Sequence, residues 1–378
     1  MSGTIDDPRP AQPDEIQEAV ALSNLMFRKD REPNMGRFYP LIFSPEHPEA
    51  VRVIKIDGRI VSMIGGVIRD MSILGCVVRC GSIGSVCTHP DLRGRGLATR
   101  LQQATVEWFD REGVDIVFVS GGRGLYRRAG FGDVGQFFRY LVPATTGSTT
   151  AAVGPVTEGA LVAMAEIHDS EPVRYIRPMA DLTVLWKTGA IRDQPGKILL
   201  VKESGKPVAY AGIQIAPRST DDGKKVLAVQ EFGGSRQALF DSTGRIAASF
   251  GATHVEFPVS WHDAAFLDIL RASGLHGTPS SWPGTCGVLS AGRLWMKLRS
   301  RLEARAGKGM TDRVEVVDLA GGGAKLSLGP DCLELPAREQ VSKFFLSFPD
   351  GTQRDEQVKR ALSAALPIPL PWPGLNFQ

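Results

Sequence analysis

The sequence predicts an α/β protein in which strands and helices alternate, and the first half of the chain gives the clearest evidence. Residues 51–70 alternate apolar and polar side chains around Asp57 and Gly58, a pair that favours a β-hairpin. The chain continues with a strand, an amphipathic helix and an apolar strand, expected over residues 80–90, 97–112 and 115–122. This order is typical of two parallel strands joined by a helix.

A weaker copy of the same order follows in the second half of the chain. Residues 197–216 predict a hairpin that turns at Ser204 and Gly205. A strand, a helix and a strand are expected after it, over residues 227–232, 236–250 and 254–260. Two copies of one unit, joined by the polar linker 143–155, explain this repeat most simply.

From about Leu294 the pattern changes, which predicts a third, smaller lobe. We expect short strands over residues 314–319, 325–328, 332–335 and 343–348, and a helix over residues 354–366. The last twelve residues, PIPLPWPGLNFQ, are too rich in proline for a helix and too apolar to be left in water, so they should dock. The expected domains are therefore residues 1–143, 150–290 and 291–378.

Composition limits the function classes. The 378 residues are 43% hydrophobic and 22% charged, and the net charge of +3 includes no basic stripe, which disfavours a nucleic-acid binder. No apolar run is long enough to span a membrane, and the polar start of the chain does not resemble a secretory signal. The sparse, odd set of five cysteines indicates a reduced, cytoplasmic protein. Cys76 and Cys80 lack the partner motif that a zinc site needs, so no metal is expected.

The segment RGRGLA, made of Arg93, Gly94, Arg95, Gly96, Leu97 and Ala98, predicts a site for a phosphate-bearing ligand. It lies directly after an expected strand and directly before an amphipathic helix, where backbone N–H groups and the helix dipole favour an anion. The two glycines let the backbone approach phosphate oxygens, and the two arginines add charged donors. Val86, Cys87 and Thr88 provide a strand edge to which amide groups of a ligand could pair.

Residues 85–101 resemble motif A of the GNAT acetyltransferase superfamily, whose pattern is Arg/Gln-x-x-Gly-x-Gly/Ala. Residues 124–132, GLYRRAGFG, are similar to motif B of that superfamily. The resemblance implies a mixed sheet that is splayed between the strands holding Val86 and Val119, with acetyl-CoA in the gap. It also implies that Val86, Cys87, Thr88 and residues 93–98 bind acetyl-CoA, and that Tyr126 protonates the sulfur of the departing CoA thiolate.

The order of the domains is similar to the enhanced-intracellular-survival (Eis-like) type of acetyltransferase. That group implies a catalytic GNAT lobe, a degenerate GNAT lobe and a third lobe resembling sterol carrier proteins. It further implies that the C-terminal carboxylate of Gln378 enters the first lobe, where it would accept the proton of the acceptor amine. The alternative is that the tail only seals the interface between the first and third lobes.

Several individual residues have more than one interpretation. Cys87 could be a nucleophile and His89 a general base, but no base stands beside Cys87 and a solvent-facing His89 is favoured. The arginines at positions 127 and 128 are equally consistent with a contact to the 3′-phosphate of CoA and with an exposed helix face. Trp282, Trp295 and Trp372 are expected in the core.

The second lobe lacks the glycine spacing, since its corresponding segment reads EFGGSRQ over residues 231–237, so it is expected to be a scaffold. We expect an N-acetyltransferase that joins acetyl-CoA and a primary amine in a ternary complex, by direct attack. The alternatives are acetylation of a protein or peptide lysine, and an apolar-ligand binding protein with a vestigial first lobe. A small-molecule or peptide amine and a homo-oligomer are the expected partners. The segment FRKDRE over residues 27–32 has three basic residues against two acidic ones, which disfavours a polycationic acceptor.

Overall fold

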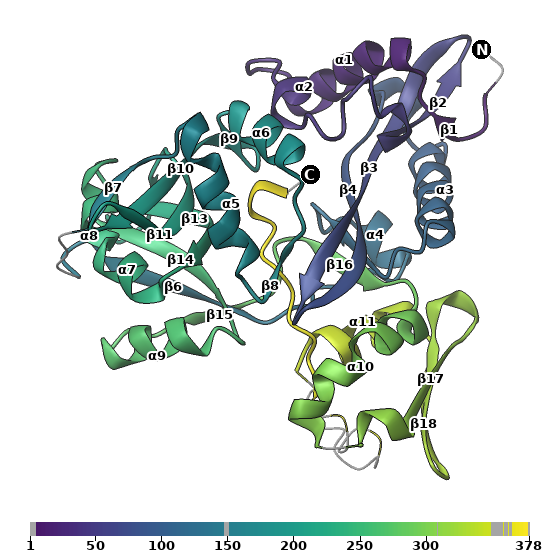
Figure 1. Ribbon diagram of the computed structural model, residues 1–378. Helices are drawn as coiled ribbons and strands as arrows, with labels where there is room; N and C mark the ends of the chain where they lie inside the picture. Colours follow the sequence, from purple (N-terminus) through teal and green to yellow (C-terminus); the bar gives the residue numbers. More distant parts are fainter. Residues whose placement is uncertain are drawn as a thin grey trace.

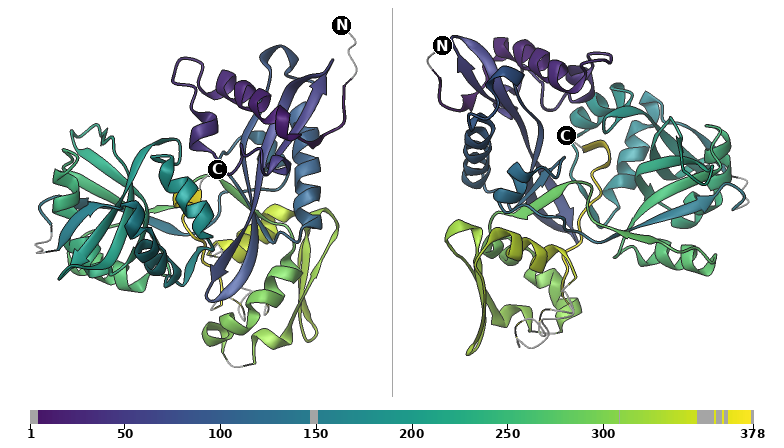
Figure 2. Two further views of the ribbon diagram at one scale, coloured as in Figure 1. Left: turned by 45° about the horizontal axis from the view of Figure 1, so that its top comes forward. Right: turned by 180° about the vertical axis from the view of Figure 1, so that it is seen from behind.

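The computed structural model describes residues 5–146, 151–307, 309–348, 358, 362 and 365–376. It has three lobes, each with its own sheet, and the C-terminal segment passes between them (Figures 1 and 2). The predicted α/β class is confirmed. No helix in the described part of the chain combines the length and the apolar character needed to cross a membrane.

The first lobe contains a seven-stranded sheet of order β1-β2-β3-β4-β5-β16, with β8 paired to β3. The expected hairpin turns at Asp57 and Gly58, which both have positive φ. Helices α1 and α2 cover one face and α3 covers the other. The strands are β1 (Arg9–Pro10), β2 (Val51–Ile56), β3 (Arg59–Ile73), β4 (Cys76–Thr88), β5 (Ile116–Val119), β8 (Val173–Tyr175) and β16 (Thr285–Val288), and the helices are α1 (Ile16–Phe27), α2 (Met35–Phe38), α3 (Leu97–Arg111) and α4 (Gly124–Arg128).

The second lobe contains a nine-stranded sheet of order β15-β6-β14-β13-β11-β10-β7, with β12 on β13 and β9 on β10. The expected helix 236–250 is divided at Ser242 into α7 and α8. The strands are β6 (Phe137–Pro143), β7 (Ala152–Pro155), β9 (Ala190–Ile191), β10 (Gln194–Glu203), β11 (Lys206–Gln214), β12 (Arg218–Ser219), β13 (Lys225–Gly234), β14 (His254–Ser260) and β15 (Thr278–Ser280), and the helices are α5 (Leu161–Asp169), α6 (Met179–Lys187), α7 (Arg236–Asp241), α8 (Thr243–Ala248) and α9 (Ala264–Ala272).

The two lobes repeat one unit, as the sequence predicts. In each lobe an antiparallel hairpin leads to a strand, one or two helices and a strand that pairs in parallel with the strand before the helix: β4 with β5, and β13 with β14. The lobes also exchange strands. Strand β6 precedes the linker but pairs with β14, whereas β16 follows the second unit but pairs with β5. Each sheet therefore includes a strand from the other side of the linker.

The third lobe packs α10 and α11 against a three-stranded antiparallel sheet, β17-β18-β19. The expectation of a strand over residues 343–348 is wrong, because these residues end helix α11, where Val341 and Phe345 lie one turn apart and are both buried. The expected helix 354–366 falls mostly outside the described residues. The elements are α10 (Ala291–Ala306), β17 (Val314–Asp318), β18 (Ala324–Leu328), β19 (Asp331–Leu335) and α11 (Arg338–Leu346).

The C-terminal tail, defined here as residues 366–376, is mostly buried inside the molecule rather than lying on its surface. Ile368, Leu370 and Leu375 are buried, and Ile368 and Leu370 belong to a core shared with the first and third lobes. Leu375 packs instead into the core of the second lobe. The tail therefore passes from the third lobe to the second through the centre of the molecule (Figure 2).

Candidate active site

The glycine-bearing loop 93–98 leads directly into α3, as predicted, but it does not follow the strand directly, because a 3-10 turn over Pro90–Leu92 separates it from the end of β4 at Thr88. Gly94 and Gly96 have φ of 78° and 75°, a conformation that strains residues with a side chain. Gly96 is the N-cap of the 15-residue helix α3. A Cβ added at either glycine would meet no atom within 4 Å, so this backbone faces open space. Accessible backbone at a helix N-terminus is suited to an anion.

Strand β4 is bulged beside this loop. Cys87 pairs with Met63 and Gly84 pairs with Gly65, so two residues of β4, Ser85 and Val86, stand opposite a single residue of β3. Ser85 has a positive φ of 50°. The parallel pairing of β4 with β5 ends before the bulge, with residue 83 opposite residue 119. Beyond that point the two strands no longer pair, and the edge of β4 is available at residues 86–88.

A cavity of about 450 Å³ lies at this edge, and we call it the motif cavity. Four further lining residues were not among the predicted site residues: Met26 and Phe27 from the last turn of α1, and Arg123 and Leu125 at the start of α4. Gly94, Arg95 and Gly96 lie in the exposed loop, and Leu97 is buried at the start of α3. The predicted residues that line the motif cavity are Val86, Cys87, Thr88, Arg93, Ala98 and Tyr126.

Helix α4 places Tyr126 in the motif cavity. The helix ends in a Schellman motif, in which the N–H groups of Gly130 and Phe131 donate to the carbonyls of Arg127 and Tyr126, with Gly130 at φ 82°. This is the physical role of the Gly-Phe pair. The side chain of Tyr126 is buried, and burial raises the pKa of Tyr126 to about 12, although the charge of Arg123 lowers it. Tyr126 is therefore protonated at neutral pH and can donate a proton.

Cys87 and His89 have environments that differ from that of Tyr126. Burial raises the pKa of the Cys87 thiol to about 12, so the thiol stays protonated and is a weak nucleophile. The side chain of His89 is 39% exposed, and its Nδ1 lies 3.7 Å from a carboxylate oxygen of Asp91. His89 is outside the set of residues that line the motif cavity.

The other residues singled out from the sequence lie away from this cavity. Arg127 forms an ion pair of 2.7 Å with Asp133, and Arg128 lines a separate cavity against α3. Trp282 and Trp295 are buried in the core, and the half-buried Trp372 packs edge-to-face on Phe137 with ring centroids 4.9 Å apart. The five cysteines are free. Gln378 lies outside the described residues.

A second cavity, of about 270 Å³, lies on the other side of the bulge, and we call it the arginine cavity. Ser85 lines the arginine cavity and Val86 lines the motif cavity, while Phe27 lines both. Both lobes contribute to it, because residues 192 and 193 form the turn between β9 and β10 of the second lobe. Its lining residues are Phe27, Arg28, Met35, Tyr39, Ser85, Ser120, Arg192 and Asp193.

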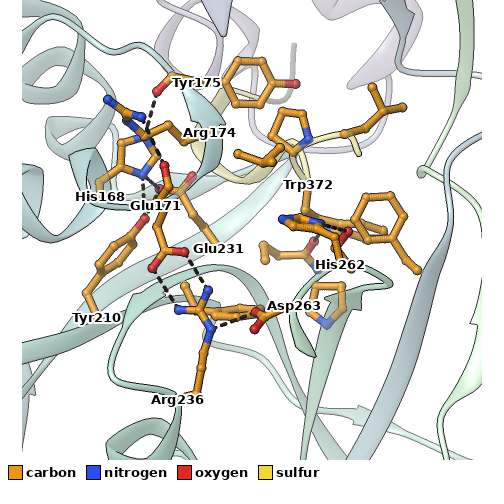
Figure 3. A pocket seen from close by; sticks show the side chains of 18 residues that line it. His168, Glu171, Arg174, Tyr175, Tyr210, Glu231, Arg236, His262, Asp263 and Trp372 are labelled. Atoms are coloured by element: carbon orange, nitrogen blue, oxygen red, sulfur yellow. Dashed lines mark hydrogen bonds and ion pairs between the residues drawn. The ribbon is translucent and has the colours of Figure 1, made fainter. Parts of the chain in front are cut away.

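The second lobe has the same splayed geometry, but the protein itself fills it. Strand β13 is bulged at Gln230, and its parallel pairing with β14 ends with residue 228 opposite residue 256. The cavity at this point, about 80 Å³, is shown in Figure 3. The tail forms one of its walls, where the indole N–H of Trp372 donates to Oε1 of Gln230 at 3.2 Å.

An internal carboxylate occupies the junction between β13 and α7, the position that corresponds to loop 93–98. Oε1 of Glu171 accepts a hydrogen bond of 2.7 Å from the N–H of Gly234. The carboxylate also receives hydrogen bonds of 2.9 and 2.6 Å from Nη1 and Nη2 of Arg236. Figure 3 shows the guanidinium of Arg236 between Glu171 and Asp263. The second lobe therefore holds its own anion where the first lobe has an open backbone.

A buried polar cluster anchors the end of the described tail to the second lobe. Oδ1 of Asn376 accepts hydrogen bonds of 2.9 and 2.6 Å from Nε and Nη2 of Arg177. Arg177 also forms an ion pair of 3.0 Å with Glu231, whose Oε2 accepts from the N–H of Leu375 at 2.9 Å. The charge of Arg177 lowers the pKa of Glu231 against the opposing effect of burial. Residue 376 is thus held by buried charges two residues before Gln378.

Comparisons with known proteins agree with this geometry. Residues 7–134 match the sequence of an acetyltransferase (GNAT) domain. No curated protein matches the chain.

Solved structures share its fold over nearly the whole length. A GCN5-related N-acetyltransferase from Anabaena variabilis has a TM-score of 0.64 at 15% identity, with 98% of this chain and 99% of that chain covered. Eis1 from Mycobacterium abscessus has a TM-score of 0.62 at 13% identity, with coverages of 97% and 99%. A GCN5-related N-acetyltransferase from Kribbella flavida has a TM-score of 0.60 at 14% identity, with coverages of 98% and 97%.

At these identities the structures establish the fold alone, and the match over residues 7–134 concerns the part of the chain that carries loop 93–98 and Tyr126. The open loop at the start of α3, the splayed strands β4 and β5 and the buried Tyr126 all lie within that match. Residues 7–134 of this chain are therefore similar in sequence to an acetyltransferase domain of the GNAT type.

Proposed function

We propose that the protein is an N-acetyltransferase that transfers the acetyl group of acetyl-CoA to a primary amine by direct attack in a ternary complex. Loop 93–98 would hold the pyrophosphate, and the edge of β4 at Val86, Cys87 and Thr88 would pair with the amides of the pantetheine arm. The thioester would then lie in the motif cavity beside Tyr126. No metal is required for this chemistry.

The observation that carries this proposal is the bulge in β4 between two cavities. Ser85 lines the arginine cavity and the next residue, Val86, lines the motif cavity. A thioester in one cavity and an amine in the other would therefore meet at the bulge without a covalent enzyme intermediate. Holding two reactants in contact in this way gives effective molarities of about 10⁵ M or more.

Residues around the bulge would then perform the remaining steps. Backbone N–H groups at residues 86–88 would stabilise the negative charge that develops on the carbonyl oxygen. Tyr126 would protonate the sulfur as the C–S bond breaks, since its high pKa keeps it in the acid form. We propose the C-terminal carboxylate of Gln378, which lies outside the described residues, as the acceptor of the amine proton. The hydrogen bonds of Asn376 to Arg177 support this assignment, because they fix the chain two residues before Gln378.

Release of CoA in the presence of primary amines tests this function. The assay measures free thiol with acetyl-CoA and a panel of small amines together with a lysine-containing peptide. We expect thiol release that depends on the amine. A tertiary amine of the same size is the matched control, since it has no N–H to lose and should give only the background rate.

The outcomes separate the candidate functions. Turnover with the peptide alone would indicate a protein lysine acetyltransferase. Binding of acetyl-CoA without turnover of any amine would contradict the proposal and favour a ligand-binding protein. The sterol-carrier character of the third lobe is also a proposal, and displacement of a fluorescent fatty acid would test it.

A further inference from the structure

The arginine cavity has a chemical character that bears on the acceptor. Two of its lining residues, Arg28 and Arg192, carry guanidinium groups, and Asp193 carries its one carboxylate. Tyr39, Ser85 and Ser120 add hydroxyl groups. The described lining therefore has a net positive charge, which disfavours a polycation and favours an anion.

Arg28 is held in place at the end of α1. Its Nε donates to Oδ1 of Asn34 at 2.7 Å, and its Nη1 donates to the carbonyl of Phe27 at 3.1 Å. Its Nη2 is buried and has no hydrogen-bond partner among the described residues. A buried donor of this kind is stabilised when a ligand accepts from it.

Arg192 reaches the same cavity from the second lobe. It occupies the turn between β9 and β10 with a φ of 60°, a left-handed conformation that strains a residue with a Cβ. Sequences tolerate such strain where the side chain is needed. Its Nη1 lies 3.4 Å from Oε1 of Gln230, the bulge residue of β13.

Charged groups of both signs act on Arg192. Burial lowers the pKa of Arg192, and the charge of Arg139 lowers it further, whereas Asp193 raises it. Arg139 itself is paired with Glu256 at 2.5 Å. Asp193 is exposed, so solvent screens its charge more than that of a buried group. Tyr39 is the other titratable group beside Arg192, and burial raises the pKa of Tyr39 to about 12, so it is neutral and can donate a hydrogen bond.

We propose that the acceptor is a small primary amine that also carries an anionic group, a carboxylate or a phosphate, bound between Arg28 and Arg192. This inference rests on the proposed function. The amine nitrogen would lie at the Ser85 bulge and bond to the acetyl carbon. The C–S bond breaks, the sulfur takes a proton from Tyr126, and the amine gives its proton to the base. Because the anionic group takes no part in the bonds that form or break, it contributes to specificity and not to the chemical step.

Matched amines test the inference. The measurement is kcat/KM for CoA release with β-alanine against β-alaninamide, with phosphoethanolamine against ethanolamine, and with spermidine. Charge-assisted hydrogen bonds from two guanidinium groups should raise kcat/KM for at least one of the two anionic amines above that of its neutral partner by about 10-fold or more. The two pairs show whether the anionic group is a carboxylate or a phosphate. Spermidine should be the poorest acceptor.

Variants then assign the preference to the arginine cavity. Arg192→Met and Arg28→Met should each reduce the ratio between acid and neutral amine towards one. Asp193→Asn should increase the ratio, because it removes the opposing charge. Arg59→Met, which changes an exposed arginine at the start of β3, is the matched control and should leave the ratio unchanged.

The results distinguish failure of the inference from failure of the proposed function. Turnover that favours the neutral amines or spermidine would overturn the inference and leave an acetyltransferase. A preference for the anionic amines that is unchanged in both Arg28→Met and Arg192→Met would also overturn it. No CoA release with any amine, under conditions in which acetyl-CoA binds, would overturn the proposed function itself.

Discussion

Tyr126 combines two properties that a general acid needs, and its surroundings produce both. The Schellman end of α4 fixes the side chain beside the edge of β4, and the ring lies against Gly121, where an added Cβ would be 3.4 Å from Cε2. Burial raises the pKa of the hydroxyl to about 12, so the acid form persists at neutral and mildly alkaline pH. In the proposed reaction, a thiolate leaving group would therefore meet a protonated phenol throughout that range.

Replacing Tyr126 with phenylalanine should lower kcat by about 10²-fold or more, the usual scale for loss of an acid–base group. The KM for acetyl-CoA should change little, because the hydroxyl acts on the sulfur only as the C–S bond breaks. Steady-state kinetics measures both quantities. Tyr140→Phe, which deletes a hydroxyl in the second lobe, is the matched control. Unchanged turnover in Tyr126→Phe would mean that water or another group protonates the sulfur.

The pH dependence of the wild type follows from the same pKa. A group with a pKa of about 12 is protonated below that value and loses its proton only above it. Ionisation of Tyr126 should therefore cause no fall in kcat between about pH 7 and pH 10. A fall in kcat with an apparent pKa near that of an ordinary tyrosine would show that the side chain is solvated during turnover.

At the scale of elements, the junction between β4 and α3 depends on glycine backbone geometry. Both Gly94 and Gly96 have positive φ, and no neighbouring atom fills the space beside them. The corresponding junction in the second lobe, between β13 and α7, has Gly234 at φ 88° but is occupied by Glu171. The same strand–helix geometry thus serves an open site in one lobe and an internal ion pair in the other.

Gly96→Glu should abolish binding of acetyl-CoA, because the new carboxylate would occupy the anion site and repel the pyrophosphate. Isothermal calorimetry measures the affinity. Gly113→Glu is a closely matched control: Gly113 has a φ of 74°, also faces open space and follows the other end of α3. It should cause a similar backbone strain of about 1–2 kcal/mol yet keep the affinity. A folded Gly96→Glu protein with wild-type affinity would refute the assignment of the loop.

The second lobe predicts the stoichiometry. Because Glu171 and the tail fill its splayed region, the wild type should bind one acetyl-CoA per chain, and Gly96→Glu should bind none. Calorimetry with a known fraction of active protein gives both values. Two molecules per wild-type chain, or one in the Gly96→Glu variant, would show that the second lobe is not merely a scaffold.

At the scale of the whole molecule, contacts between the lobes position the site. Strands β6 and β16 each join the sheet on the other side of the linker. Helix α10 of the third lobe is bound to the first lobe through Asp115, which is fully buried and forms ion pairs of 2.9 Å with Arg293 and 2.6 Å with Lys297. The first lobe therefore depends on both of the other lobes. The chain that follows the second unit supplies the edge strand β16, and the third lobe supplies helix α10, which binds Asp115.

The C-terminal tail gives a prediction at this scale. Adding a few residues after Gln378 should preserve the fold and the affinity for acetyl-CoA but abolish turnover, because the α-carboxylate would no longer be at the end of the anchored segment. CoA release and calorimetry measure the two effects. An N-terminal extension of equal length is the control. Full activity of the C-terminally extended protein would exclude the carboxylate from the mechanism and favour the alternative in which the tail only seals an interface.

Short-range patterns in the sequence determined much of the first lobe. The Asp57–Gly58 hairpin, the parallel unit of β4, α3 and β5, the open loop before α3 and the turn after Tyr126 depend on residues close together in the chain. Side-chain periodicity and the conformational freedom of glycine are local properties, so the sequence displays them directly. The repeat in the second lobe followed from the same patterns.

Only the tertiary structure decided which distant segments meet. The exchange of β6 and β16, the approach of Arg192 to Arg28, the carboxylate of Glu171 at the second junction and the course of the tail each join residues far apart in the chain. Helix α11, which replaces the strand expected over residues 343–348, also depends on burial of its apolar side chains in the core. Strand edges and charged side chains accept many partners of similar energy, and the choice among them comes from packing of the complete core, which no local pattern encodes.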